Sequence, residues 1–137
     1  MSYGVSAALQ AAVYQRLAAD PALGTLVGSS IYDALPSGAL PPLYVVLGAE
    51  EARDASDKTG GGALHEFTIS VLTESAGFST AKAAAAAVSD ALVDAPLVLT
   101  RGSLVSLNFY KAKAARIGTG DMRQINLIFR ARVADDT

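Results

Sequence analysis

The last long segment of the chain, residues 122–133, alternates apolar and polar side chains with a period of two. Ile125, Leu127 and Phe129 fall on one side of this run, and polar residues stand between them. The alternation predicts a β-strand that is buried on one face and solvated on the other. Such a strand needs neighbouring strands for its backbone, and its apolar face needs a covering layer of helices or a second sheet.

Two other runs, residues 64–73 and 104–113, alternate in the same way. The apolar sides comprise His65, Phe67, Ile69 and Val71 in the first run and Val105, Leu107 and Phe109 in the second, which Lys111 and Lys113 extend. LYVVL at residues 43–47 is rich in β-forming residues and predicts a further strand, and residues 31–33 predict a short one. Because short turns join the later strands, we expect a mostly antiparallel sheet.

Apolar residues at helical spacing predict two helices, over residues 5–19 and about 79–94. The buried stripe of the first comprises Val5, Leu9, Ala12, Val13 and Leu17, and that of the second Ala84, Ala87, Val88, Ala91 and Leu92. We expect Ser79 to cap the second helix, with Phe78 as a hydrophobic staple. Between the helices, Asp20 is suited to be the N-cap of a short helical turn that starts with Pro21.

The segment at residues 49–62, AEEARDASDKTGGG, has six charges, three consecutive glycines and no large apolar side chain. This composition predicts a long mobile loop. Such a loop is functional, or is a hairpin arm that orders on binding, or is tolerated slack. The whole chain, residues 1–137, is then expected to be one α+β domain. Its mostly antiparallel β-sheet has two helices packed on one face.

Composition excludes several classes of protein. The chain has 137 residues, of which 51% are apolar and 18% charged, which excludes a charge-rich disordered chain. It has no cysteine, so disulfides, iron–sulfur clusters and thiolate zinc sites are excluded. The N-terminus lacks the pattern of a secretory signal, and the most apolar stretch, residues 81–93, is too short and polar to span a bilayer. We therefore expect a soluble intracellular protein.

Charge is unevenly distributed along the chain. Residues 1–100 hold four basic and ten acidic residues, whereas residues 101–137 hold seven basic and three acidic ones. One interpretation is head-to-tail docking between copies or with an acidic partner. The other is that these charges simply solvate the outer faces of strands, because folding can mix the two halves in space.

Catalytic motifs are absent from the sequence. His65 is the only histidine and no G-x-S-x-G elbow exists, so neither a metal site nor a catalytic triad is expected, and His65 is interpreted as a partly buried strand-end residue. The glycines at residues 60–62 are not part of a phosphate-binding loop. Glu50 and Glu51 are expected to be solvated. The sequence therefore predicts no enzyme, no cofactor and no metal.

Four segments in a fixed order carry a family resemblance. They are LAADPALGTLVGSSIYDALP at residues 17–36, PPLYVVLG at 41–48, HEFTISVLTESAGFSTAKAAAAAVSDAL at 65–92 and MRQINLIFRARV at 122–133. Together they resemble the minor tail proteins, also called tail-completion or tail-terminator proteins, of long-tailed phages and phage-like gene transfer agents. The resemblance implies a homo-oligomeric ring, usually a hexamer, on the head-proximal end of the tail tube. Such a ring stops tube growth, meets the head-side connector and leaves a lumen for DNA.

The resemblance also suggests roles for individual residues. The segment at residues 49–62 is expected to line the lumen or to reach a neighbouring ring, and its charged members are Glu50, Glu51, Arg53, Asp54, Asp57 and Lys58. Its acidic residues would keep DNA from sticking by like-charge repulsion. Arg130 and Arg132 are expected to pair with acidic groups of the next subunit. Residues 44–47, including Tyr44 and Val46, are expected to be an edge strand that pairs across subunits.

These roles imply the tail tube protein and a head-side connector (stopper) protein as partners, with no membrane and no specific DNA binding. The protein would be cytoplasmic during assembly and then part of the particle. Three alternatives stay open. The chain is a head-side connector subunit, or a small ligand-binding module or enzyme with polar groups around His65, or a nucleic-acid binder that uses its basic C-terminal strands.

Overall fold

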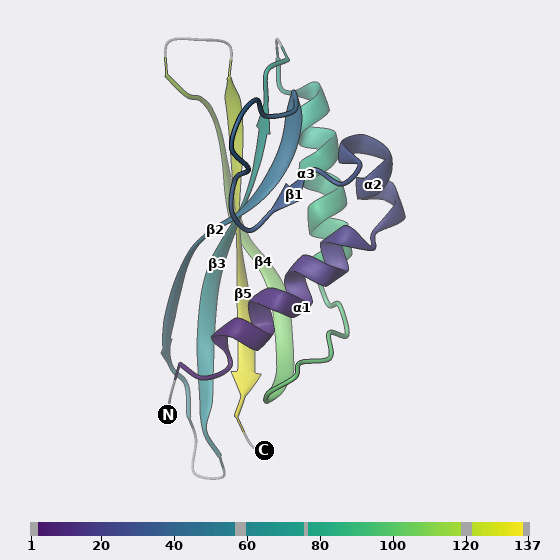
Figure 1. Ribbon diagram of the computed structural model, residues 1–137. Helices are drawn as coiled ribbons and strands as arrows, with labels where there is room; N and C mark the ends of the chain where they lie inside the picture. The colour runs from purple at the N-terminus through teal and green to yellow at the C-terminus, as the bar shows by residue number, and fades with distance from the viewer. Residues whose placement is uncertain (1–2, 57–59, 76, 119–121, 136–137) are drawn as a thin grey trace.

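The computed structural model describes residues 3–56, 60–75, 77–118 and 122–135. Over these residues the chain forms three helices and five strands (Figure 1). In chain order they are α1 (Ser6–Ala18), α2 (Pro21–Val27), β1 (Ile31–Tyr32), β2 (Leu43–Asp54), β3 (Gly62–Thr73), α3 (Ser79–Leu92), β4 (Ser103–Arg116) and β5 (Arg123–Ala134).

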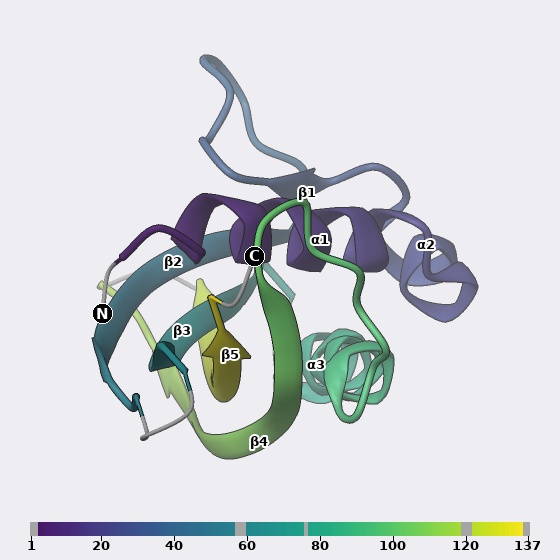
Figure 2. The same cartoon turned by 90° about the horizontal axis from the view of Figure 1, so that it is seen from below.

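The strands form one sheet in the order β1-β2-β3-β5-β4. The neighbours β2–β3, β3–β5 and β5–β4 are antiparallel, and the two-residue β1 pairs in parallel with Val45 and Val46 of β2. Figure 2 shows the strands as a curved layer with β2 at one side and β4 at the other, and with α1 and α3 on the same side of the layer. The predicted α+β fold is therefore confirmed.

The core lies between this sheet and the helices. The predicted inward residues of β3 and β5 are buried, and Ile69, Phe129 and Ala131 have no exposed surface. The predicted stripes of α1 and α3 are buried as well. Because most of the α3 stripe is alanine, its backbone can approach the sheet closely.

Residues 49–54 lie in a strand and not in the predicted loop. β2 continues to Asp54 and β3 begins at Gly62, with a register shift between Leu47 and Glu50. Backbone pairing with β3 satisfies polar groups of this segment, while side chains such as Glu51 and Arg53 stay exposed. Tertiary pairing thus overrides a composition that is unfavourable for a strand. The segment is mainly a hairpin arm, and Asp57 and Lys58 lie outside the described residues.

Two register shifts in β4 also change the predicted faces of that strand. They fall between Leu104 and Ser106 and between Phe109 and Lys111. An extra residue in a strand reverses the orientation of the side chains after it. Val105 is accordingly 60% exposed rather than buried. Lys111 and Lys113 pair with the outward residues of β5 and do not extend the Phe109 side, so that part of the prediction is wrong.

The two predicted helix caps have different outcomes. The Asp20 carboxylate accepts a hydrogen bond from the Leu23 backbone N–H at 2.9 Å, so the predicted N-cap of α2 is confirmed. Ser79 is instead the first residue of α3, and the N-cap position is held by Phe78 with no side-chain capping bond. The prediction that Ser79 caps this helix is wrong by one position.

Leucine truncation should separate core from surface. Leu17 has no exposed surface whereas Leu35 is 50% exposed. We expect Leu17→Ala to lower the free energy of unfolding by about 2–5 kcal/mol, because it removes buried apolar area and leaves a cavity. The matched Leu35→Ala should change it by about 0.5 kcal/mol or less. Denaturant unfolding monitored by circular dichroism measures both, and equal effects would contradict this assignment of the core.

Candidate functional site

A polar cluster lies where the start of α1 meets the inner face of the sheet. Glu50 resumes the β2 register after the shift that follows Leu47, opposite the buried Phe67 of β3. Its carboxylate faces the helix layer, although Glu50 was predicted to be a solvated loop residue. His65 of β3 also faces this side and is fully buried, not partly buried as predicted.

Three side chains donate hydrogen bonds to the Glu50 carboxylate. His65 Nδ1 lies 2.8 Å from Oε2, and because a carboxylate only accepts, this nitrogen carries the proton. The Ser6 hydroxyl donates from the first turn of α1 at 2.8 Å, and the Tyr3 hydroxyl donates to the same carboxylate. The Tyr3 ring also stacks on His65 with 6.1 Å between ring centroids. The cluster thus joins α1 to two strands.

The hydrogen bonds of the cluster favour the charged form of Glu50. Burial by itself raises the pKa of this carboxyl group, but the hydrogen bonds from Tyr3, His65 and Ser6 outweigh that effect and hold the pKa below its ordinary value. The side chain of Glu50 is 18% exposed. His65 Nε2 is buried and has no hydrogen-bond partner among the described residues.

The cluster has the arrangement of a structural clamp. The nearby groove of about 580 Å³ follows the exposed side of α1, from Tyr3 to Tyr14, and His65 does not line it. Over the residues that the structure describes, no three His, Cys, Asp or Glu side chains are grouped to hold a metal ion. Nor is any helix among them long and apolar enough to cross a membrane.

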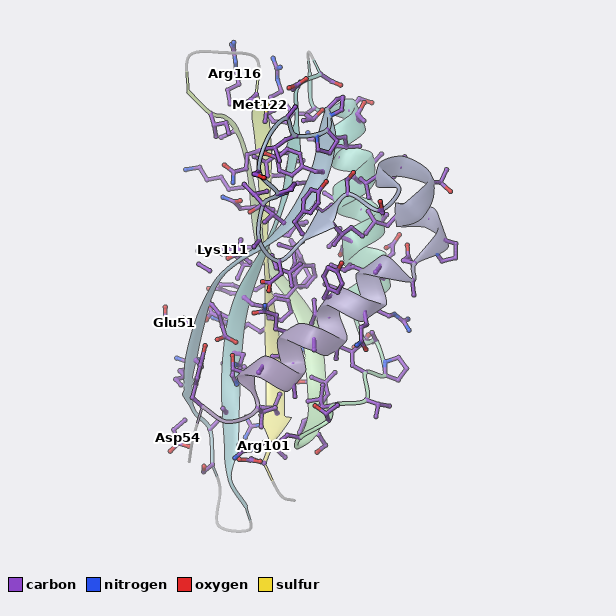
Figure 3. The ribbon with its side chains drawn as sticks, viewed as in Figure 1. Glu51, Asp54, Arg101, Lys111, Arg116 and Met122 are labelled. Atoms are coloured by element: carbon purple, nitrogen blue, oxygen red, sulfur yellow. The ribbon has the colours of Figure 1, made fainter. Side chains whose placement is uncertain are left out.

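An ion pair fastens Asp135, just after β5, at the same end of the sheet. Arg101 donates from Nε and from a terminal guanidinium nitrogen to the two carboxylate oxygens of Asp135, at 3.1 and 2.8 Å. The guanidinium packs on Gly4, where a Cβ atom would lie 2.3 Å from it. The start of α1 and the end of β5 thus meet (Figure 1), and Arg101 lies at this lower end (Figure 3).

The outer face of the sheet carries two of the predicted interface residues. Arg130 binds Glu66 of the same chain at 3.1 Å and stacks 3.6 Å over the Tyr110 ring. Arg132 donates to the Ala55 carbonyl at 3.1 Å. Both arginines, which were predicted to reach the next subunit, therefore already have partners within their own chain.

Residues 44–47 are not the free edge that the sequence predicted. Val45 and Val46 pair with β1, and Tyr44 is only 4% exposed. Burial, reinforced by the nearby Glu74, raises the pKa of the Tyr44 phenol. The reason for the error is β1, a two-residue strand that covers the edge of β2 at this point.

The other predicted lumen residues lie further along β2. Glu51, Arg53 and Asp54 are exposed, and Figure 3 shows Asp54 nearer the lower end of the molecule than Glu51. Asp54 accepts hydrogen bonds from the hydroxyl and the backbone N–H of Ser56, which lower the pKa of its carboxyl group.

Sequence reasoning missed the roles of Tyr3 and Ser6 in the cluster. The one signal that pointed toward them was a histidine on an apolar strand face, because a buried polar group needs a hydrogen-bond partner. The identity of that partner depends on how α1 lies on the sheet, and the sequence does not display it.

Replacing Glu50 should change the acid stability of the protein. The folded-state pKa of Glu50 is lowered, so the stability that this group contributes is present above the pKa of the unfolded chain and is lost as pH falls through the folded pKa. We expect Glu50→Gln to lower the free energy of unfolding at pH 7 by about 1–3 kcal/mol. The variant should also lose less stability than the parent on acidification.

Denaturant titrations at a series of pH values between neutrality and acid measure both effects. Glu51→Gln is the matched control, because this neighbouring carboxylate is exposed and points away from the cluster. Parallel pH profiles for the parent and the Glu50→Gln variant would show that the carboxylate does not stabilise the fold.

Comparisons with known proteins bear on the whole chain. Residues 11–134 match the family described as "Tail completion protein gp17". Among solved structures, a chain in "Virion of native gene transfer agent (GTA) particle" is 64% identical, with a TM-score of 0.93 over 97% of this chain and 99% of that chain. No curated protein sequence matches.

The family match covers all five strands, α2, α3 and the second part of α1. The fold similarity to the virion chain extends over almost the full length of both proteins, and the identity is high enough to carry more than the fold. The chain therefore belongs to the tail completion protein gp17 family and is a structural protein of a phage-like tail.

Proposed function

We propose that this protein is the ring subunit that caps the head-proximal end of a phage-like tail tube, ends tube growth and joins the tail to the head-side connector. The observation that carries the proposal is its similarity, along 97% of the chain, to a chain of a gene transfer agent virion. The family match to a tail completion protein points to the same particle. The ring is proposed to be a homo-hexamer, with the tail tube protein on one side.

Properties of the fold support an assembly role. The polar cluster around Glu50 clamps α1 to the sheet, so the ligand-binding alternative gains no support from His65. Two strands, β4 and the second half of β2, have one side without a partner strand in the described chain. Unpaired strand edges of this kind are surfaces on which another chain can dock.

The hairpin formed by β2 and β3 is proposed to line the lumen or to contact a neighbouring ring. Of its predicted acidic residues, Glu51 and Asp54 are exposed, whereas the Glu50 charge is held by the cluster with His65. On a lumen wall these carboxylates repel the DNA phosphates and so favour passage without binding. Where the hairpin instead contacts a neighbouring subunit, they are available to its basic residues. We propose that DNA meets no specific site on this protein.

Deletion of the gene in a particle-producing strain tests the function. We expect negative-stain electron microscopy of the lysate to show free tail tubes of uncontrolled length beside unattached heads, because nothing would stop tube polymerisation. Plasmid expression of the intact gene is the control and should restore joined particles. Tails of normal length beside tailless or leaking heads would assign the protein to the head-side connector instead. Intact particles would contradict any structural role.

A further inference from the structure

The sheet has a free strand edge at each of its two margins. At one side β4, Ser103–Arg116, pairs only with β5 within the described chain. At the other side β1 covers only Val45 and Val46 in that part of the chain, so β2 beyond Leu47 has an open edge. Figure 2 shows β2 and β4 at opposite sides of the curved layer. Each edge presents backbone N–H and C=O groups to solvent.

These two edges carry opposite charge. β4 holds Lys111, Lys113 and Arg116 and no acidic residue. All three are exposed, and no ion pair binds any of them among the residues that the structure describes. The open part of β2 holds three acidic residues and one basic residue, and Glu51, Asp54 and the basic Arg53 are exposed, so its exposed charges are negative on balance.

One pair of opposite charges in the middle of the outer face is already neutralised. Arg130 of β5 pairs with Glu66 of β3 at 3.1 Å, so those two charges have no need of an external partner. Arg132 of β5 donates to the Ala55 carbonyl and keeps its charge. At the margins, Lys111, Lys113 and Arg116 lie on β4, and Glu51 and Asp54 lie on β2. The uneven distribution of charge in the sequence therefore gives the folded sheet one acidic edge and one basic edge.

The β4 edge also exposes apolar surface. Val105, Phe109 and Tyr110 are 60%, 45% and 43% exposed. A groove of about 320 Å³ lies between α3 and β4, where small side chains such as Ala86 and Ala112 leave room. Lysines and bulges on an edge strand discourage indiscriminate pairing. These lysines nevertheless attract a partner surface that carries carboxylates.

We propose that the β4 edge of one copy docks against the open part of β2 of the next copy, with Lys111 and Lys113 facing Glu51 and Asp54. The contact is heterologous, because each copy uses its β4 edge toward one neighbour and its β2 edge toward the other. Repeated contacts of this kind close into a ring when the rotation between copies fits. This inference rests on the proposed ring function and specifies the subunit contact.

Charge exchange between the two edges tests the contact. One variant carries Lys111→Glu and Lys113→Glu, a second carries Glu51→Lys and Asp54→Lys, and a third carries all four changes. In the deletion strain, we expect each two-site variant to lower the yield of joined particles about tenfold or more, because like charges face each other. The four-site variant should recover most of the yield, because the attraction is restored with reversed sign.

Asp90→Lys is the control for charge alone, since Asp90 is exposed on α3 and lies on neither strand edge. Unfolding midpoints of the purified variants, which should match the parent, show that losses of yield are not losses of folding. Full yield from both two-site variants would overturn the contact. The contact would also be overturned if the four-site variant, with its folding intact, gave no higher yield of joined particles than either two-site variant.

Cross-linking provides a readout that is independent of yield. The chain has no cysteine, so Asn108→Cys on β4 and Arg53→Cys on β2 introduce unique thiols at exposed positions. A short bismaleimide applied to particles should link a chain with both cysteines into multimers and link chains with one cysteine into none. Absence of multimers from particles that contain the doubly substituted chain would overturn the contact. Failure of the deletion phenotype, by contrast, would overturn the ring function itself.

Discussion

The fold depends on removing one face of a long antiparallel sheet from water. β3 and β5 present a continuous apolar face, on which Ile69 and Phe129 have no exposed surface. The helices α1 and α3 cover this face, and they lie on the same side of the sheet. Since both long helices are used on the inner face, the outer face and the sheet edges remain available to other molecules.

The helix layer is fixed to the sheet by polar contacts as well as by packing. The Glu50 carboxylate is partly buried, and a buried charge is tolerated only where hydrogen-bond donors replace water. Ser6, Tyr3 and His65 are those donors, and they come from α1, the segment before it and β3. The clamp therefore requires α1 to start at one place on the sheet. The residue types of this cluster resemble those of an active site, yet its hydrogen bonds hold α1 in place on the sheet.

The distribution of charge connects the fold to assembly. Where opposite charges meet on the outer face, as Glu66 and Arg130 do, they pair within the chain. At the margins, exposed charges such as Glu51 on β2 and Lys111 on β4 are kept apart by the strands between them. The sheet order β1-β2-β3-β5-β4 puts the acidic strand and the basic strand on opposite sides. The ring proposed for this protein needs two different surfaces that fit each other, and this strand order supplies one acidic and one basic edge.

Local spacing was enough to predict the elements whose periodicity is strong, because a single sequence displays that spacing directly. The alternation in residues 64–73 and 122–133 and the apolar stripes of the two long helices predicted the α+β fold and most of the core correctly. The same alternation placed His65 on the inner face. It could not show that Glu50 would become the hydrogen-bond partner of His65.

Pairing between distant segments settled the features that the sequence left undecided or predicted wrongly. The segment at residues 49–54 is a strand because β3 pairs with it, and Glu50 lies inside because a register shift turns it inward. Likewise the faces of Lys111 and Lys113 changed at bulges in β4, and β1 covered the edge at residues 45–46. Register shifts and edge coverage are set by partners far away in the chain, and composition does not encode them locally.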